Sequence, residues 1–128
     1  MKLRIRGNSI RFRLTKEEVA KFGESGIVQD CIEFGVGEDK KLFYRLENSE
    51  NSAQINAVFE NGRITLRIPK SAAEQWTRTE QVGFETKQLL DNENELRILV
   101  EKDFACLKPR SGEDNADTFP HPQENAQC

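Results

Sequence analysis

The segment KLRIRGNSIRFRL, residues 2–14, decides the fold that we expect for this chain. On either side of Gly7, apolar residues alternate with arginines, which is typical of β-strands with one apolar and one charged face. Gly7 can adopt the positive φ angle that a tight hairpin turn requires. The segment therefore predicts a β-hairpin with its arginines on one face. These arginines are Arg4, Arg6, Arg11 and Arg13.

A short helix is predicted directly after this hairpin. Thr15 is a favourable N-cap residue, and Glu18, three positions later, completes a capping box. Leu14 and Val19 have the spacing of a hydrophobic staple across that cap. Gly26 can end the helix in the left-handed conformation.

Similar patterns predict the remaining elements. Asn61-Gly62 is a strong signal for a hairpin turn, and Pro69 is suited to the first position of a helix. We expect strands at residues 27–34, 42–47, 54–60, 63–68, 81–86 and 95–101, and a second short helix at residues 70–76.

The order of these elements repeats after 54 residues. Shifting the chain by this distance places Phe22 on Trp76 and Val28 on Val82, and it brings 14 apolar positions into coincidence. About eight coincidences are expected by chance. The pattern indicates an ancient duplication of a ββαββ unit, with pseudo-repeats at residues 1–54 and 55–108.

The predicted fold class is α+β in a single domain spanning residues 1–128. We expect the duplicated unit to form an eight-stranded, antiparallel and strongly curved sheet or barrel with two short helices. Separate domains are disfavoured because each half alone would bury too little apolar surface. Residues 104–128 are predicted to form a coil that wraps the body, anchored by Phe104, Leu107 and Phe119.

Composition limits the classes of function. A chain of 128 residues with net charge −3 is less suited to nucleic acid than a basic domain would be, so we expect no nucleic-acid partner. No apolar run is long enough to span a membrane, and three cysteines are too few for a disulfide framework. We therefore expect a cytoplasmic protein without a membrane partner, and leave its oligomeric state open.

The charge is unevenly distributed along the chain. Residues 1–14 carry five basic residues and no acidic one, whereas residues 111–128 carry four acidic residues and no basic one. Arginine dominates on the predicted strands, and its planar guanidinium group binds phosphate and carboxylate in bidentate fashion. The candidate ligand-binding residues are Arg4, Arg6, Arg11, Arg13, Arg45, Arg67 and Arg97. The alternative is a solvated sheet face on which arginines and glutamates balance each other.

Other chemistry has less support. Cys106, His121 and Cys128 lack the compact ligand spacing of zinc sites, so we expect no metal and no cofactor. His121 lies between two prolines, and we expect it to be structural. Nothing near Cys31 or Cys106 marks an activated nucleophile, so no catalytic residue is assigned.

Three segments carry a resemblance to a known family. Residues 1–14 (MKLRIRGNSIRFRL), residues 100–110 (VEKDFACLKPR) and the stretch from Gly112 to Pro122, which ends in FPHP, resemble a family of small bacterial proteins of unknown function. The resemblance covers nearly the whole chain. It implies that the C-terminal segment belongs to the domain, and it assigns no activity.

The duplicated architecture with an arginine-rich face is also similar to the triphosphate-tunnel (CYTH-type) proteins. Those enzymes begin with an E-x-E-x-K strand, which provides metal-binding carboxylates. Here the first strand has Lys2, Arg4 and Arg6 at these positions, and only Glu93-Asn-Glu-Leu-Arg97 approaches the pattern.

We therefore expect a small binding module whose arginine-rich sheet face takes a phosphate-containing or other anionic ligand. One alternative is an enzyme that acts on phosphorylated small molecules with Glu85, Glu101 and Asp103. The other is a plain protein-interaction domain.

Overall fold

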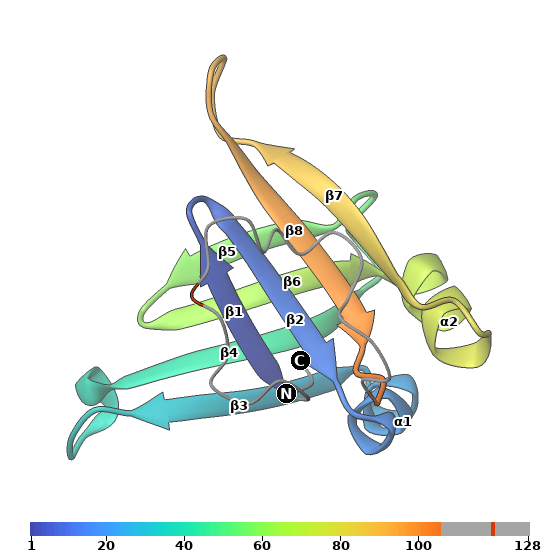
Figure 1. Cartoon of the computed structure of the whole chain (residues 1–128), viewed down its shortest axis with the longest axis horizontal. Helices are drawn as coiled ribbons and strands as arrows, with labels where there is room; N and C mark the ends of the chain where they lie inside the picture. Colours follow the sequence, from blue (N-terminus) through green and yellow to red (C-terminus); the bar gives the residue numbers. More distant parts are fainter. Residues whose placement is uncertain (106–118, 120–128) are drawn as a thin grey trace.

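The computed structural model describes residues 1–105 and Phe119, which contain two four-stranded β-sheets and two α-helices. One sheet lies in front of the other, and the strands of the two sheets cross steeply (Figure 1). The elements in chain order are β1 (Lys2–Arg6), β2 (Ser9–Leu14), α1 (Lys16–Ser25), β3 (Ile27–Glu33), the 3₁₀ turn η1 (Glu38–Lys40), β4 (Lys41–Ser49), β5 (Asn56–Glu60), β6 (Arg63–Pro69), α2 (Lys70–Arg78), β7 (Gly83–Leu89) and β8 (Glu95–Lys102).

Local signals explain most of these boundaries. The Thr15 hydroxyl accepts a hydrogen bond from the Glu18 N–H, and the Glu18 carboxylate accepts one from the Thr15 N–H, which confirms the capping box. Gly26 ends α1 with a left-handed φ of 76°. Asn61 and Gly62 both have positive φ between β5 and β6, as a type I′ hairpin turn requires.

Glu18 also holds the start of the chain. Its carboxylate accepts a hydrogen bond from the Met1 amino group. Burial raises the pKa of Glu18, but the hydrogen bonds from Met1 and Thr15 outweigh burial, so that the pKa lies below its ordinary value. The charged carboxylate therefore stabilises the junction between β1 and α1.

Each sheet combines hairpins from the two halves of the chain. The strand order is β1-β2-β8-β7 in the first sheet and β3-β4-β6-β5 in the second. The outer pairs are antiparallel, but the central pairs, β2 with β8 and β4 with β6, are parallel. The prediction of a wholly antiparallel sheet is therefore wrong, because residue alternation specifies the faces of a strand and not the direction of its partner.

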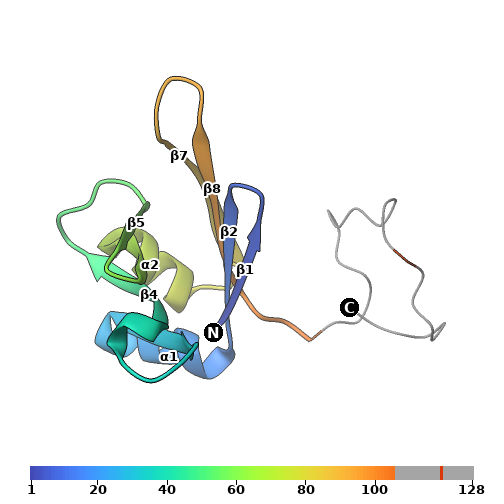
Figure 2. The ribbon, with the colours of Figure 1, turned by 90° about the vertical axis from the view of Figure 1, so that its left-hand side faces the viewer.

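The described residues form two packed sheets and no closed barrel, which corrects the single curved sheet or barrel predicted above. α1 and α2 carry the chain from one sheet to the other and lie against each other at one end of the sandwich (Figures 1 and 2). No helix in the described part of the chain is long and apolar enough to cross a membrane. The buried core is shared by both sheets and both helices: Phe12, Leu14, Val19, Phe22, Val28, Leu46, Leu66, Ile68, Ala73, Trp76, Ile98 and Val100.

The two halves repeat the same pairing. Ser9 pairs with Arg97 in the first sheet, and 54 positions along, Arg63 pairs with Phe43 in the second. Phe22 and Trp76, which the same shift superimposes, are both buried and meet edge to face with ring centroids 6.1 Å apart.

The correspondence shifts by two residues after α2. In the first half, Val28 pairs with Leu46. A shift of 54 residues leads to Val82 and Val100, but Val100 pairs with Phe84 instead of Val82. Val82 is 54% exposed, so its predicted equivalence with Val28 is wrong. The physical reason is the longer connection between α2 and β7, in which the Val82 carbonyl accepts hydrogen bonds from the Trp76 indole and the Lys102 N–H.

Two of the three residues predicted to anchor the C-terminal segment are exposed. Phe104 is 55% exposed and Phe119 is 98% exposed, so neither ring is buried as predicted. Leu107, Cys106, His121 and Cys128 lie outside the described residues, as does most of the coil predicted at residues 104–128.

Gln88 joins the two sheets at their edges. Its side-chain amide on β7 accepts a hydrogen bond from the Ala57 N–H at 2.6 Å and donates one to the Ala57 carbonyl at 3.0 Å. Ala57 lies on β5, the edge strand of the second sheet. The Gln88 amide thus satisfies backbone groups that an edge strand would otherwise expose to a further strand.

We predict that Gln88→Leu lowers the free energy of unfolding by about 1–3 kcal/mol, because a partly buried N–H and carbonyl lose their partners. Gln29→Leu is the matched control, since Gln29 is exposed on the outer face of edge strand β3. Chemical denaturation measures both changes. Equal stability of the two variants would show that the Gln88 link contributes nothing.

Gly83 is required where β7 meets β8. A Cβ atom at this position would approach the Val100 carbonyl oxygen and lie 2.9 Å from Glu101 Cα, which is closer than packed atoms allow. We predict that Gly83→Ala destabilises the protein by about 1–3 kcal/mol because β7 must move away from β8. Thermal unfolding measures the loss, and a melting temperature unchanged from that of the wild type would contradict this prediction.

Candidate functional site

The predicted arginines do not gather in one place. Arg4, Arg6, Arg11, Arg13 and Arg97 lie on the outer face of the first sheet. Arg45 and Arg67 lie on the outer face of the second sheet, with the core between the two groups. The single seven-residue site is therefore corrected to two separate surfaces. Each strand does alternate between core and arginine as predicted, but the strands belong to different sheets.

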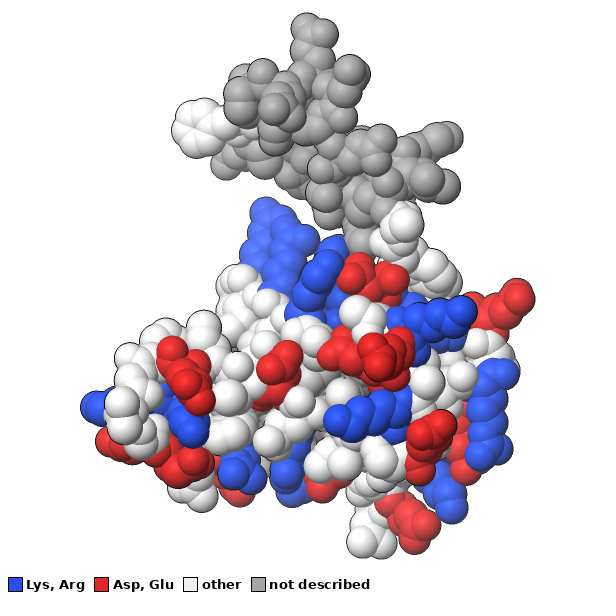
Figure 3. All heavy atoms as spheres, turned by 90° about the horizontal axis from the view of Figure 1, so that it is seen from below, with Lys and Arg blue, Asp and Glu red and all other residues white. Residues whose placement is uncertain are grey.

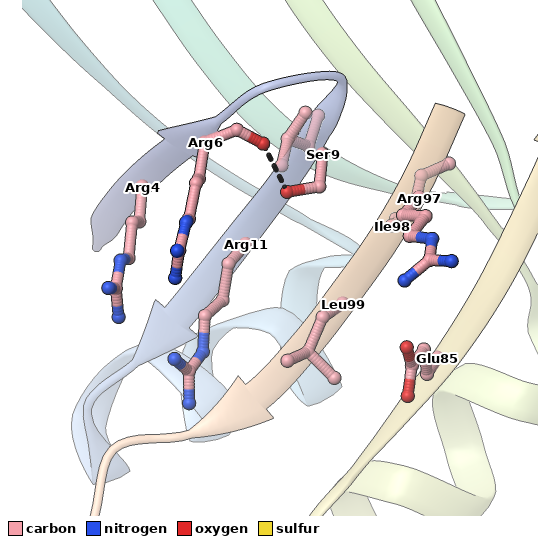
Figure 4. A pocket seen from close by; sticks show the side chains of 9 residues that line it. Arg4, Arg6, Ser9, Arg11, Glu85, Arg97, Ile98 and Leu99 are labelled. Carbon is pink, nitrogen blue, oxygen red and sulfur yellow. Dashed lines mark hydrogen bonds between the residues drawn. The ribbon is translucent and has the colours of Figure 1, made fainter. Parts of the chain in front are cut away.

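The first groove crosses the outer face of the first sheet and has a volume of about 210 Å³. Arg4, Arg6 and Arg11 extend side by side from β1 and β2, and Arg97 of β8 points toward Glu85 of β7 (Figure 4). The groove is lined by Arg4, Arg6, Ser9, Ile10, Arg11, Glu85, Arg97, Ile98 and Leu99.

The hollow follows from the register of the strands. Ser9 lies between Arg6 and Arg97 in the same row of the sheet, and Arg11 stands next along β2. A short serine surrounded by long side chains leaves space above the sheet. The Ser9 hydroxyl donates a hydrogen bond to the Arg6 carbonyl at 2.7 Å, which fixes the turn between β1 and β2.

Beside the first groove, one carboxylate bridges two arginines. Glu101 Oε1 accepts hydrogen bonds from Arg11 Nε at 2.9 Å and from Arg13 Nε at 2.8 Å. Arg13 Nη2 is buried without a hydrogen-bond partner in the described residues. Asp103 forms an ion pair with Lys2 at 2.9 Å. The contact with Glu101 holds Arg11 in a fixed orientation. Arg6, in contrast, forms no ion pair with any residue in 1–105.

The second groove occupies the equivalent place on the second sheet and has a volume of about 440 Å³. Its central residue is Thr65, which is only 6% exposed and lies between Arg45 and Val58 in the register. The groove is lined by Glu38, Phe43, Arg45, Val58, Glu60, Asn61, Arg63, Thr65 and Arg67. Each groove thus has a short hydroxyl residue among arginines, although the two are not equivalent in the repeat, since Ser9 corresponds to Arg63.

The chain matches a family of unknown function (DUF7009) over residues 1–123. It belongs to this family. The resemblance to a family of unknown function is thereby confirmed, while a bacterial origin and a likeness to triphosphate-tunnel proteins stay predictions. Neither the comparison with curated proteins nor the comparison with solved structures gave a match.

Several groove residues of this family member were not among the predicted site residues. Ser9 and Thr65 are ordinary strand residues in the sequence, and only the register reveals that long side chains surround them. Arg63 follows the same alternation as Arg67 but was not among the predicted site residues. Within the described residues, no group of three or more His, Cys, Asp or Glu could hold a metal ion.

Basic and acidic side chains mix on much of the surface. On the face seen in Figure 3, basic and acidic side chains are interspersed, along the upper rim as well as over the rest. The first groove differs from this background, because four arginines and one glutamate line it. The second groove is more balanced, with three arginines and two glutamates.

We predict that Glu101→Gln lowers the free energy of unfolding by about 1–3 kcal/mol, because two partly buried arginines lose their shared carboxylate. Glu47→Gln is the matched control at the equivalent position of the second sheet. Glu47 lies 3.6 Å from Arg67 and 4.0 Å from Arg45 and is more exposed, so its loss costs less than about 1 kcal/mol. Denaturation of both variants tests this order, and a larger loss in Glu47→Gln would contradict it.

Proposed function

We propose that the protein is a binding module whose first groove takes a phosphate-containing anion. The observation that carries this proposal is the convergence of Arg4, Arg6, Arg11 and Arg97, from three strands, on a groove with Glu85 as its one carboxylate among the described residues. Guanidinium groups bind phosphate oxygens through paired, charge-assisted hydrogen bonds.

The arrangement of charge supports a multiply charged ligand. Arg4 and Arg11 are directly opposite each other on neighbouring strands, where two like charges repel. An anion in the groove would add to the neutralisation that Glu101 already gives Arg11. Arg6 and Arg97 are exposed and can turn toward such a ligand at little cost in packing.

The contacts of the carboxylates favour binding over hydrolysis. Of the three acidic residues considered for an enzyme, Glu101 holds Arg11 and Arg13, and Asp103 pairs with Lys2. Glu85 alone lines the groove. The proposed binding module therefore needs only groups that are already placed, whereas the enzyme would need a second carboxylate in the groove.

The repeat supports a proposal about origin. We infer that the two grooves descend from one ancestral surface through duplication of a ββαββ unit. The equivalent parallel registers, at a shift of 54 residues, support this inference. The lining residues then diverged, since Arg6 corresponds to Glu60 and Arg11 to Thr65.

The test is calorimetric titration with inorganic triphosphate. We expect the wild type to bind it with a dissociation constant below about 1 mM. The double variant Arg6→Gln/Arg97→Gln should bind at least about tenfold more weakly, because it loses charge-assisted hydrogen bonds. The affinity should also fall as salt is raised, since these side chains are exposed.

Arg78→Gln is the control, because Arg78 is exposed in the last turn of α2 and lies outside both grooves. It should bind triphosphate as the wild type does. Absence of heat from the wild type, or equal affinity of the double variant and the wild type, would overturn the proposal.

A further inference from the structure

The second groove has a different chemistry from the first, although the repeat places both on equivalent surfaces. In its central row Arg45, Thr65 and Val58 are neighbours on β4, β6 and β5. In the adjacent row Phe43, Arg63 and Glu60 are neighbours on the same strands. The groove therefore combines cationic, hydroxyl and apolar side chains within two rows of one sheet.

Arg45 is held in place for recognition of an anion. Its Nε donates a hydrogen bond to Thr65 Oγ1 at 3.1 Å, and its Nη2 lies 4.0 Å from Glu47 Oε1. A guanidinium group has five N–H donors, so these contacts leave donors for a ligand. Because Thr65 is buried, its hydroxyl fixes Arg45 at the floor of the groove.

Arg63 supplies a second cation beside an apolar wall. Its Cζ lies 4.9 Å from the centroid of the Phe43 ring, in a cation–π contact. Among the described residues no carboxylate lies within ion-pair distance of Arg63, although Glu60 is its neighbour in the register. Val58 adds apolar surface in the Thr65 row, on the side of Thr65 away from Arg45.

We infer that the second groove is a separate binding site for an organic carboxylate with an apolar body. Arg45 and Arg63 bind the carboxylate, and Phe43 and Val58 contact the apolar part. The volume of about 440 Å³ lies in the range of small-molecule sites. This site is additional to the proposed phosphate site, and the core separates the two.

The balance of charge explains why the two grooves select different anions. Two glutamates and three arginines line the second groove, whereas one glutamate and four arginines line the first. A triply charged phosphate is repelled more strongly by the two glutamates than a single carboxylate is. Most of the lining of the second groove is polar, and Phe43 and Val58 supply the apolar part, which a ligand with an apolar body can contact and inorganic phosphate cannot.

The probe is N-acetyl-L-phenylalanine, and N-acetyl-L-phenylalanine amide is the matched compound without a carboxylate. We expect titration followed by amide NMR shifts to perturb residues 43–45 and 58–65, with a dissociation constant of about 1 mM. Arg45→Gln and Arg63→Gln should each weaken binding at least about fivefold, and Arg78→Gln should not change it. Arg63 is exposed, so Arg63→Gln preserves the fold, and retained dispersion of the amide spectrum verifies this.

Saturation with inorganic triphosphate should leave the carboxylate affinity unchanged, because the sites lie on opposite faces. If the wild type binds the carboxylate but does not bind triphosphate, the proposed function is overturned and this inference stands. Equal binding of the amide compound, shifts confined to other residues, or no shift at about 10 mM probe would overturn the inference. Competition between triphosphate and the carboxylate would also overturn it.

Discussion

Both sheets depend on parallel pairing between strands from opposite halves of the chain. β2 lies beside β8, and β4 lies beside β6, so neither half can complete a sheet by itself. On the inner side, these pairs bring Phe12 against Val100 and Leu46 against Leu66, and all four side chains are fully buried. At about 1.5–3 kcal/mol for each buried apolar side chain, these contacts dominate the stability of the layers.

The same pairing fixes the outer faces. Arg13 stands opposite Glu101, and Glu47 stands opposite Arg67, so each parallel pair carries an arginine–glutamate contact at its outer surface. These contacts stabilise the layers less than the core does, but they orient the arginines next to the grooves. The pairing that buries the core on one side of each sheet therefore also determines which arginines line the groove on the other.

Local elements could be predicted because their signals are local. Thr15 and Glu18 form the capping box, and Asn61 and Gly62 adopt the predicted turn. The arrangement of hairpins could not be predicted, because alternation in β2 is the same whether its neighbour is parallel or antiparallel. For the same reason, the arginines were correctly assigned to outer faces, but Arg45 and Arg67 could not be separated from Arg4 and Arg6 without knowledge of the sheets. Val82 was misplaced because the two extra residues before β7 do not disturb the period of the strand.

The separation of the paired strands in the chain has a consequence for the order of folding. Arg45 and Thr65, neighbours in the second sheet, are 20 positions apart, whereas Arg13 and Glu101 in the first sheet are 88 positions apart. Closing the longer loop costs more entropy and slows pairing. During synthesis the second sheet can assemble once β6 has emerged, whereas β2 cannot pair with β8 until β8 has been synthesised. Of the two grooves, the one on the first sheet is therefore the later to form, and a chain interrupted before β8 displays the first hairpin without its partner strand.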